Sequence, residues 1–135
     1  DAVVDCQRVF GHERVVIFSN SAGSKDDAPH FEEAKSIEEL MKIKVLCHGT
    51  KKPEGITELV ELMQVEPHEL VMVGDRYSTD ILFGNSYGML TIRTEQLSKD
   101  NESVLNLTMQ AIEEFIIARL VANGVQAPVH DLYKV

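Results

Sequence analysis

The sequence is poor in cysteine, in cationic side chains and in long apolar runs, and each shortage excludes a class of protein. Its two cysteines, Cys6 and Cys47, lie in no CxxC or other metal-binding spacing, so a reducing intracellular compartment is the simpler expectation. The formal net charge of −9 argues against a nucleic-acid partner, because no basic stripe is present to neutralise phosphate backbones. No apolar run approaches the roughly 20 residues that a membrane-spanning helix needs.

What is present favours one α/β domain over residues 1–135, because 135 residues with 44% hydrophobic content can form a core. Short β-branched and aromatic runs predict strands at 15–18, 43–47, 71–73 and 89–92. Apolar residues at helical spacing predict helices at 1–10, 31–41, 56–63, 81–88 and 105–120. The apolar stripe of the last helix is expected to pack into the core. The alternation predicts a Rossmann-like parallel sheet flanked by helices.

Two carboxylates follow the predicted strand 71–73 on one short loop. Asp75 comes directly after Gly74, and Asp80 precedes the apolar start of the next helix. Two acids on one loop repel each other, and such loops face the ligand crevice of an open α/β sheet, so a bound hard cation such as Mg²⁺ explains the pair. The alternative is that Asp75 is a turn residue and Asp80 a favourable charge at a helix N-terminus.

Two further loops follow predicted strands and carry polar groups. Ser19, Asn20 and Ser21 offer hydroxyl and amide groups that can bind an oxyanion, and Lys51 and Lys52 offer cations for phosphoryl oxygens. The alternatives are an ordinary Ser-rich turn and solvated surface lysines. Because the carboxyl ends of parallel strands share an edge, all three loops are expected to meet in one crevice. A hydroxyl, a lysine and a carboxylate pair suit phosphoryl transfer.

In their order and spacing these loops resemble those of the haloacid dehalogenase-like phosphatases. The resemblance implies that Ser19 holds the transferring phosphoryl group, that Asn20 adds a hydrogen bond and that Lys52 stabilises the group. It also implies Mg²⁺ as the cofactor, bound by Asp75, with Asp80 supporting or completing the metal site. The same stretches supply three candidate substrate-binding residues, namely Ser21, Lys51 and Arg76.

Three stretches, residues 19–23, 48–53 and 74–80, look more specifically like the mitochondrial and plastid phosphatidylglycerophosphate phosphatases of that superfamily. This resemblance implies a phosphorylated lipid head group as substrate, phosphatidylglycerol as product and precursor of cardiolipin, and a mitochondrion or plastid as location. An acidic chain would make peripheral contact with an anionic membrane only through a local patch.

One departure from the family pattern concerns the nucleophile. The resemblance calls for an Asp-x-Asp motif after a first strand, and none occurs in the 135 residues. The nucleophile is therefore expected upstream, and this chain is expected to be a fragment that is inactive by itself. The sheet would then lack its first central strand, which leaves strand edges to be completed by another chain segment.

Three functional hypotheses follow. The first is a Mg²⁺-dependent phosphatase that acts through an aspartyl-phosphate intermediate on phosphatidylglycerophosphate. The second is a noncatalytic haloacid dehalogenase-like (HAD-like) module that binds phosphate and metal or takes part in the assembly of a complex. The third is a phosphatase for a soluble sugar or nucleotide phosphate, which activity on soluble substrates would distinguish from the first.

Overall fold

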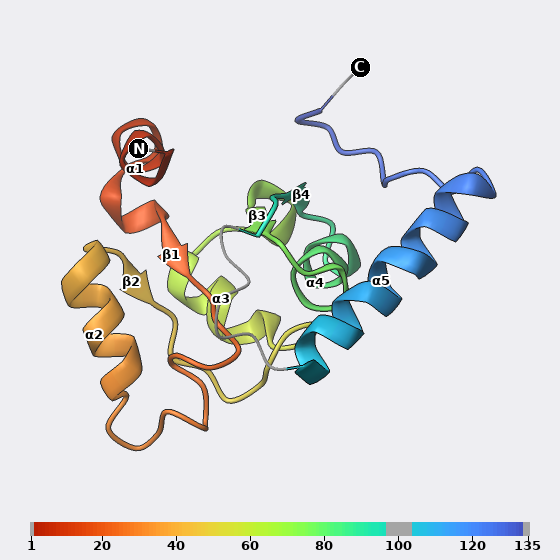
Figure 1. Cartoon of the computed structure of the whole chain (residues 1–135). Coiled ribbons are helices and arrows are strands. Elements are labelled where there is room, and N and C mark those ends of the chain that lie inside the picture. Colours follow the sequence, from red (N-terminus) through yellow and green to blue (C-terminus); the bar gives the residue numbers. More distant parts are fainter. Residues whose placement is uncertain (1, 97–103, 134–135) are drawn as a thin grey trace. The chain divides into compact units, whose positions relative to one another are not determined.

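Helices and short parallel strands alternate along the chain in a computed structural model that describes residues 2–96 and 104–133. By its internal contacts the chain divides into two units, residues 1–66 and residues 67–135. The four strands found among these residues form two parallel pairs, β1 with β2 and β3 with β4 (Figure 1). The α/β class and the parallel pairing are therefore confirmed. The pair β1 and β2 lies in the first unit, and the pair β3 and β4 lies in the second. The single domain stays a prediction.

The first unit is built around a two-stranded sheet. Its elements are α1 (Ala2–Phe10), η1 (His12–Arg14), β1 (Val16–Ile17), α2 (Glu32–Met41), β2 (Lys44–Val45) and α3 (Ile56–Met63). Ile17 pairs with Val45, and the small core around this pair consists of buried Ala22, Ala34 and Val45 with partly buried Phe31 packed against it. Burial of these apolar side chains fixes α2 against the sheet.

The second unit places its strands beside a short helix. Its elements are η2 (Pro67–Glu69), β3 (Val71–Gly74), η3 (Tyr77–Ile81), α4 (Leu82–Ser86), β4 (Leu90–Arg93) and α5 (Val104–Ala122). Gly84 permits the close packing of α4, because a Cβ atom at this position would lie 3.0 Å from Cβ of Met72 and would overlap with Thr91. Phe83, the residue before Gly84 in α4, is fully buried. Val73 on β3 is 54% exposed, so this face of the strand is uncovered in the described part of the chain.

Helix α5 has the predicted position but buries a different face from the predicted one. The predicted core stripe is exposed, with fractions of 71% at Leu105, 47% at Ile112 and 49% at Ile116, so its assignment to the core was wrong. The buried side chain of α5 is Glu113. Apolar spacing fixes which residues share a face but not which face meets the rest of the unit, and the face that does so carries Glu113, which pairs with Arg76. None of the described helices is long and apolar enough to cross a membrane.

Asp27 connects the loop after β1 to the start of α2. Its carboxylate accepts hydrogen bonds from the backbone N–H groups of Gly23 at 3.0 Å, Glu33 at 2.9 Å and Ala34 at 2.9 Å. These bonds, that of Gly23 above all, hold the pKa of the Asp27 carboxyl below its ordinary value of 3.8, although partial burial acts in the opposite direction. The carboxylate thus fixes the segment that follows the Ser19 loop.

The variant Asp27→Asn is expected to be less stable than the parent near neutral pH. A folded pKa below the unfolded value means that the stabilisation is fully present above about pH 3.8 and is lost as the pH falls through the lower folded value. Urea unfolding between pH 7 and pH 3 should therefore show a lower free energy of unfolding for Asp27→Asn than for the parent. This difference should disappear only at the lowest pH values of that range. Asp26→Asn, at the exposed neighbour, is the control; an equal loss there would contradict the role of Asp27.

Candidate active site

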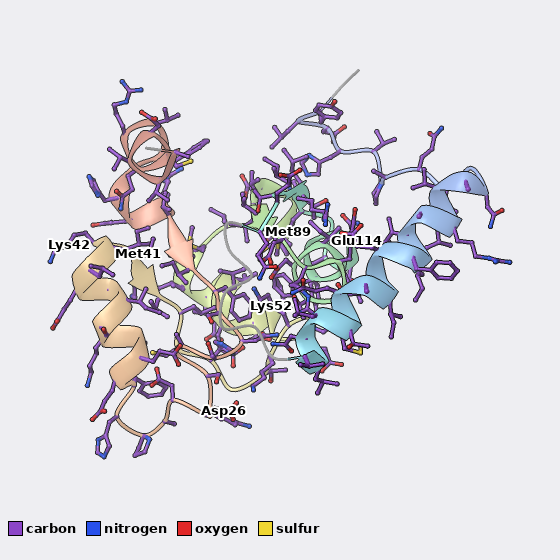
Figure 2. The ribbon with its side chains drawn as sticks, in the orientation of Figure 1. Asp26, Met41, Lys42, Lys52, Met89 and Glu114 are labelled. Atoms are coloured by element: carbon purple, nitrogen blue, oxygen red, sulfur yellow. The ribbon has the colours of Figure 1, made fainter. Side chains whose placement is uncertain are left out.

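Lys52 and Asn20 are bound to each other across 32 positions of the sequence. The Asn20 side chain accepts a hydrogen bond from the Lys52 backbone N–H at 2.8 Å and donates one to the Lys52 carbonyl oxygen at 3.1 Å. Lys52 is buried, and its Nζ donates to the carbonyl oxygen of Phe18 at 2.6 Å (Figure 2 labels Lys52). The structure therefore brings the polar loop after β1 together with the lysine loop after β2.

His48 adds a second connection between the same two loops. Its Nε2 lies 2.7 Å from the carbonyl oxygen of Ser19, and its Nδ1 lies 2.7 Å from the carbonyl oxygen of Thr50. The ring is buried and contacts Phe18 edge to face, with 4.7 Å between ring centroids. Because these contacts join backbone groups of both loops, His48 fixes the position of Ser19 relative to the Lys52 loop.

The other candidates of the first unit lie at the margin of this cluster. Ser19 Oγ lies 3.2 Å from Ser21 Oγ and accepts a hydrogen bond from the Ser21 backbone N–H at 3.2 Å. Ser21 in turn donates to Glu33 at 3.2 Å. The amine of Lys51 forms an ion pair with exposed Asp26. Ser19 is thus half-buried beside Asn20 and Lys52, whereas Lys51 is directed to a surface acid.

In the second unit, Asp75 and Asp80 lie at the two ends of one short loop. Asp75 follows β3 and is half-buried, and Asp80 lies within the π-helical turn η3 with its side chain buried. Oδ2 of Asp80 accepts the backbone N–H of Arg76 at 3.2 Å. A Cβ atom at Gly74 would lie 2.5 Å from that oxygen, so glycine is required where the Asp80 side chain packs against the end of β3.

These two carboxylates fit a hard cation in the chemistry of their donors. Mg²⁺ is commonly bound by one or two carboxylates and completes its shell with water and phosphate oxygens. Within residues 2–96 and 104–133, no group of three His, Cys, Asp or Glu side chains is close enough to hold a metal by itself. Asp75, supported by Asp80, would therefore hold a cation together with ligands from water or substrate.

Arg76 is held by α5 at the edge of a cavity of about 540 Å³. Its guanidinium donates to Glu113, with 2.8 Å from Nη2 to Oε1, and Ser78 Oγ donates to the same oxygen at 2.5 Å. Arg93 at the end of β4 stacks on the Tyr77 ring, 4.3 Å from its centroid, and pairs with Glu114 (labelled in Figure 2). Asp75 also lines this cavity.

Three residues that hold the candidate loops in place were given no role by the sequence analysis, namely Asp27, His48 and Glu113. His48 lies in the quoted loop, but a histidine beside glycine does not reveal which carbonyl groups it contacts. Asp27 was treated as part of a polar loop, although an acid shortly before a helix is a recognised signal for binding backbone N–H groups. Glu113 carried no sequence signal, because most helical glutamates are solvated. The common crevice for the two sets of candidates stays a prediction.

Comparison with known proteins places the chain in a family. Residues 1–98 match the family model described as mitochondrial PGP phosphatase, and the chain belongs to this family. It is 42% identical over 132 residues to phosphatidylglycerophosphate phosphatase 1, chloroplastic, of Chlamydomonas reinhardtii, covering 97% of this chain and 49% of the relative. The predicted resemblance is therefore confirmed.

Two further relatives carry similar names. Phosphatidylglycerophosphate phosphatase 1, chloroplastic/mitochondrial, of Arabidopsis thaliana is 39% identical, over 94% of this chain and 36% of the relative. The mitochondrial phosphatidylglycerophosphatase GEP4 of Saccharomyces cerevisiae is 34% identical, over 72% of this chain and 59% of the relative. The names agree with the predicted location in a mitochondrion or plastid. The chain spans about half the length of these relatives, and no solved structure matches it significantly.

Proposed function

We propose that the protein containing this chain is a Mg²⁺-dependent phosphatase that converts phosphatidylglycerophosphate to phosphatidylglycerol. Membership of the family and the names of three relatives support the substrate. The observation that carries the proposal is the pair of hydrogen bonds between Asn20 and Lys52, with Lys52 Nζ bound to the carbonyl of Phe18. It fixes a buried lysine at the backbone of Phe18, directly before Ser19, and supports a role of this lysine in phosphoryl binding.

The residues of this chain act by binding and orientation. Ser19 Oγ and the Asn20 amide donate hydrogen bonds to the phosphoryl oxygens, and Lys52 neutralises charge that develops on them. Ser21, Lys51 and Arg76 contact the remainder of the substrate. The loops that follow β1 and β2 are held in place by two residues that touch no substrate, His48 and Asp27.

Asp75, supported by Asp80, holds Mg²⁺, which when bound supplies positive charge for the phosphate. The covalent step needs an aspartate from outside these 135 residues, since they contain no Asp-x-Asp. Its carboxylate oxygen would attack phosphorus as the ester P–O bond breaks, and the second aspartate of that motif, acting as general acid, would give its proton to the leaving alkoxide and so release phosphatidylglycerol. Water then hydrolyses the aspartyl-phosphate and releases inorganic phosphate.

The test of substrate compares phosphate release by the full-length protein from phosphatidylglycerophosphate in mixed micelles with release from glycerol 3-phosphate, a hexose phosphate and a nucleoside monophosphate. The proposal predicts that kcat/KM for the lipid exceeds that for each soluble ester by about 100-fold or more, because the lipid's remaining groups add binding energy. Equal values would favour a phosphatase for soluble esters. Absence of release, together with non-acidic residues at the upstream Asp-x-Asp positions, would favour a noncatalytic module.

A further inference from the structure

Helix α5 contacts the rest of its unit through a polar side chain. Glu113 is 9% exposed, whereas most other side chains of this helix are exposed. Its neighbours on the same face, Gln110 and Ile117, are partly buried. An acid at the centre of a docking face is unusual, because a buried carboxylate is costly unless it is paired and hydrogen-bonded. The partners of Glu113 therefore explain why the acid is there.

These partners belong to the loop that joins Asp75 to Asp80. Arg76 donates to Glu113 from two N–H groups on one edge of its guanidinium, with 2.8 Å from Nη2 to Oε1 and 3.5 Å from Nε to Oε2. Ser78 Oγ donates to Oε1 at 2.5 Å. Burial raises the pKa of Glu113, but Arg76 and Ser78 lower it further, so that the pKa lies below the usual glutamate value. Glu113 is thus an anion held by two loop residues.

The same loop residue connects Glu113 to Asp80. The backbone N–H of Arg76 donates to Asp80 Oδ2 at 3.2 Å, and its carbonyl oxygen accepts the N–H groups of Asp80 at 3.0 Å and Ile81 at 3.1 Å. The side chain of Arg76 is therefore fixed by α5 while its backbone fixes the Asp80 carboxylate. Glu113 thus contacts Arg76, and Arg76 in turn contacts Asp80.

We propose that Glu113 is a positioning residue that holds the loop between Asp75 and Asp80 in the conformation that binds a divalent cation. In its metal-binding part this inference rests on the proposed function. Glu113 lies beyond residues 1–98, which the family model matches, so α5 adds a structural requirement that the matched motifs do not contain. Loss of the Glu113 charge releases Arg76 and loosens the turn that carries Asp80.

The test compares Glu113→Gln with Glu114→Gln in the full-length protein. The two variants remove the same charge from adjacent positions of α5, but Glu114 is 56% exposed and pairs with Arg93 at the end of β4. Hydrogen exchange is measured at the backbone amides of Asp80 and Ile81 and, as an internal reference, in β4. Binding of Mn²⁺, an oxygen-ligated cation like Mg²⁺, is measured by electron paramagnetic resonance.

The inference predicts that Glu113→Gln speeds exchange at the Asp80 and Ile81 amides about tenfold and weakens Mn²⁺ binding by a similar factor, while Glu114→Gln changes each less than about twofold. Glu113→Asp, which retains the charge, should give a smaller effect than Glu113→Gln. Unchanged exchange in Glu113→Gln, an equal effect of Glu114→Gln, or an equal rise of exchange in β4 would overturn the inference. Exchange requires no substrate, so an inactive wild-type protein would refute the proposed function without deciding this test.

Discussion

Replacing Asp75 with asparagine should lower Mg²⁺-dependent phosphate release by the full-length protein by about 100-fold or more, because a metal-binding oxygen and its charge are lost. Asp75 is half-buried at the end of β3, and the neutral amide has the same shape, so the melting temperature should change little. Initial rates across a range of Mg²⁺ concentrations, together with thermal unfolding, give both quantities.

Glu95→Gln is the matched control for this experiment. Glu95 is an exposed acid shortly after β4 and lines the same cavity as Asp75. Its replacement removes one negative charge from the lining of the same cavity. The rate should stay within about twofold, because solvent and salt screen the effect of an exposed charge on the reaction. Undiminished release by Asp75→Asn at ordinary Mg²⁺ concentrations would contradict the assigned metal site.

Lys52→Met should lower both activity and stability. Methionine retains an unbranched apolar stem for the buried position but removes the amine that binds the carbonyl oxygen of Phe18 at 2.6 Å. Loss of this charged hydrogen bond should reduce the free energy of unfolding by about 1–3 kcal/mol. Loss of the cation should reduce kcat/KM by about 100-fold. Urea unfolding and phosphate release at saturating Mg²⁺ measure the two effects separately.

Lys35→Met provides the comparison for Lys52. Lys35 is exposed on α2, and its replacement should change the free energy of unfolding by less than about 0.5 kcal/mol, as for most surface positions. A Lys52→Met protein that unfolds like the parent and retains its activity would show that the buried amine has neither role. A Lys52→Met protein that is less stable but fully active would show that the amine supports the fold and does not bind phosphate.

The strand positions were predictable because their sequence signal is local. Val16 and Ile17 lie in a continuous β-branched run, and Val71 opens a short apolar run, and both kinds of run suit strands. The lengths and coverage of the strands were not predictable, because they depend on neighbouring chain segments. Val73 is apolar yet 54% exposed, and nothing in its own sequence window distinguishes a covered strand face from an uncovered one.

The candidate site, like the strands, was predictable only in its local features. The order of Ser19, Lys52 and Asp75 along the chain suggested three loops with related chemistry, and the structure joins the first two through Asn20. The supporting residues could not be found in this way. The contact of Glu113 with Arg76 spans 37 positions, and a pairing at such distance leaves no periodicity, so the exposed stripe of α5 was taken for its buried face.

The most direct test of the account is Mg²⁺-dependent phosphate release from phosphatidylglycerophosphate, measured for the full-length protein and for this 135-residue chain side by side. We expect release by the full-length protein in Mg²⁺, loss of release when the cation is chelated, and no release by the 135-residue chain, which has no Asp-x-Asp. Release by the short chain, abolished by changing Asp5, would contradict the account, and so would a full-length protein that leaves this lipid intact.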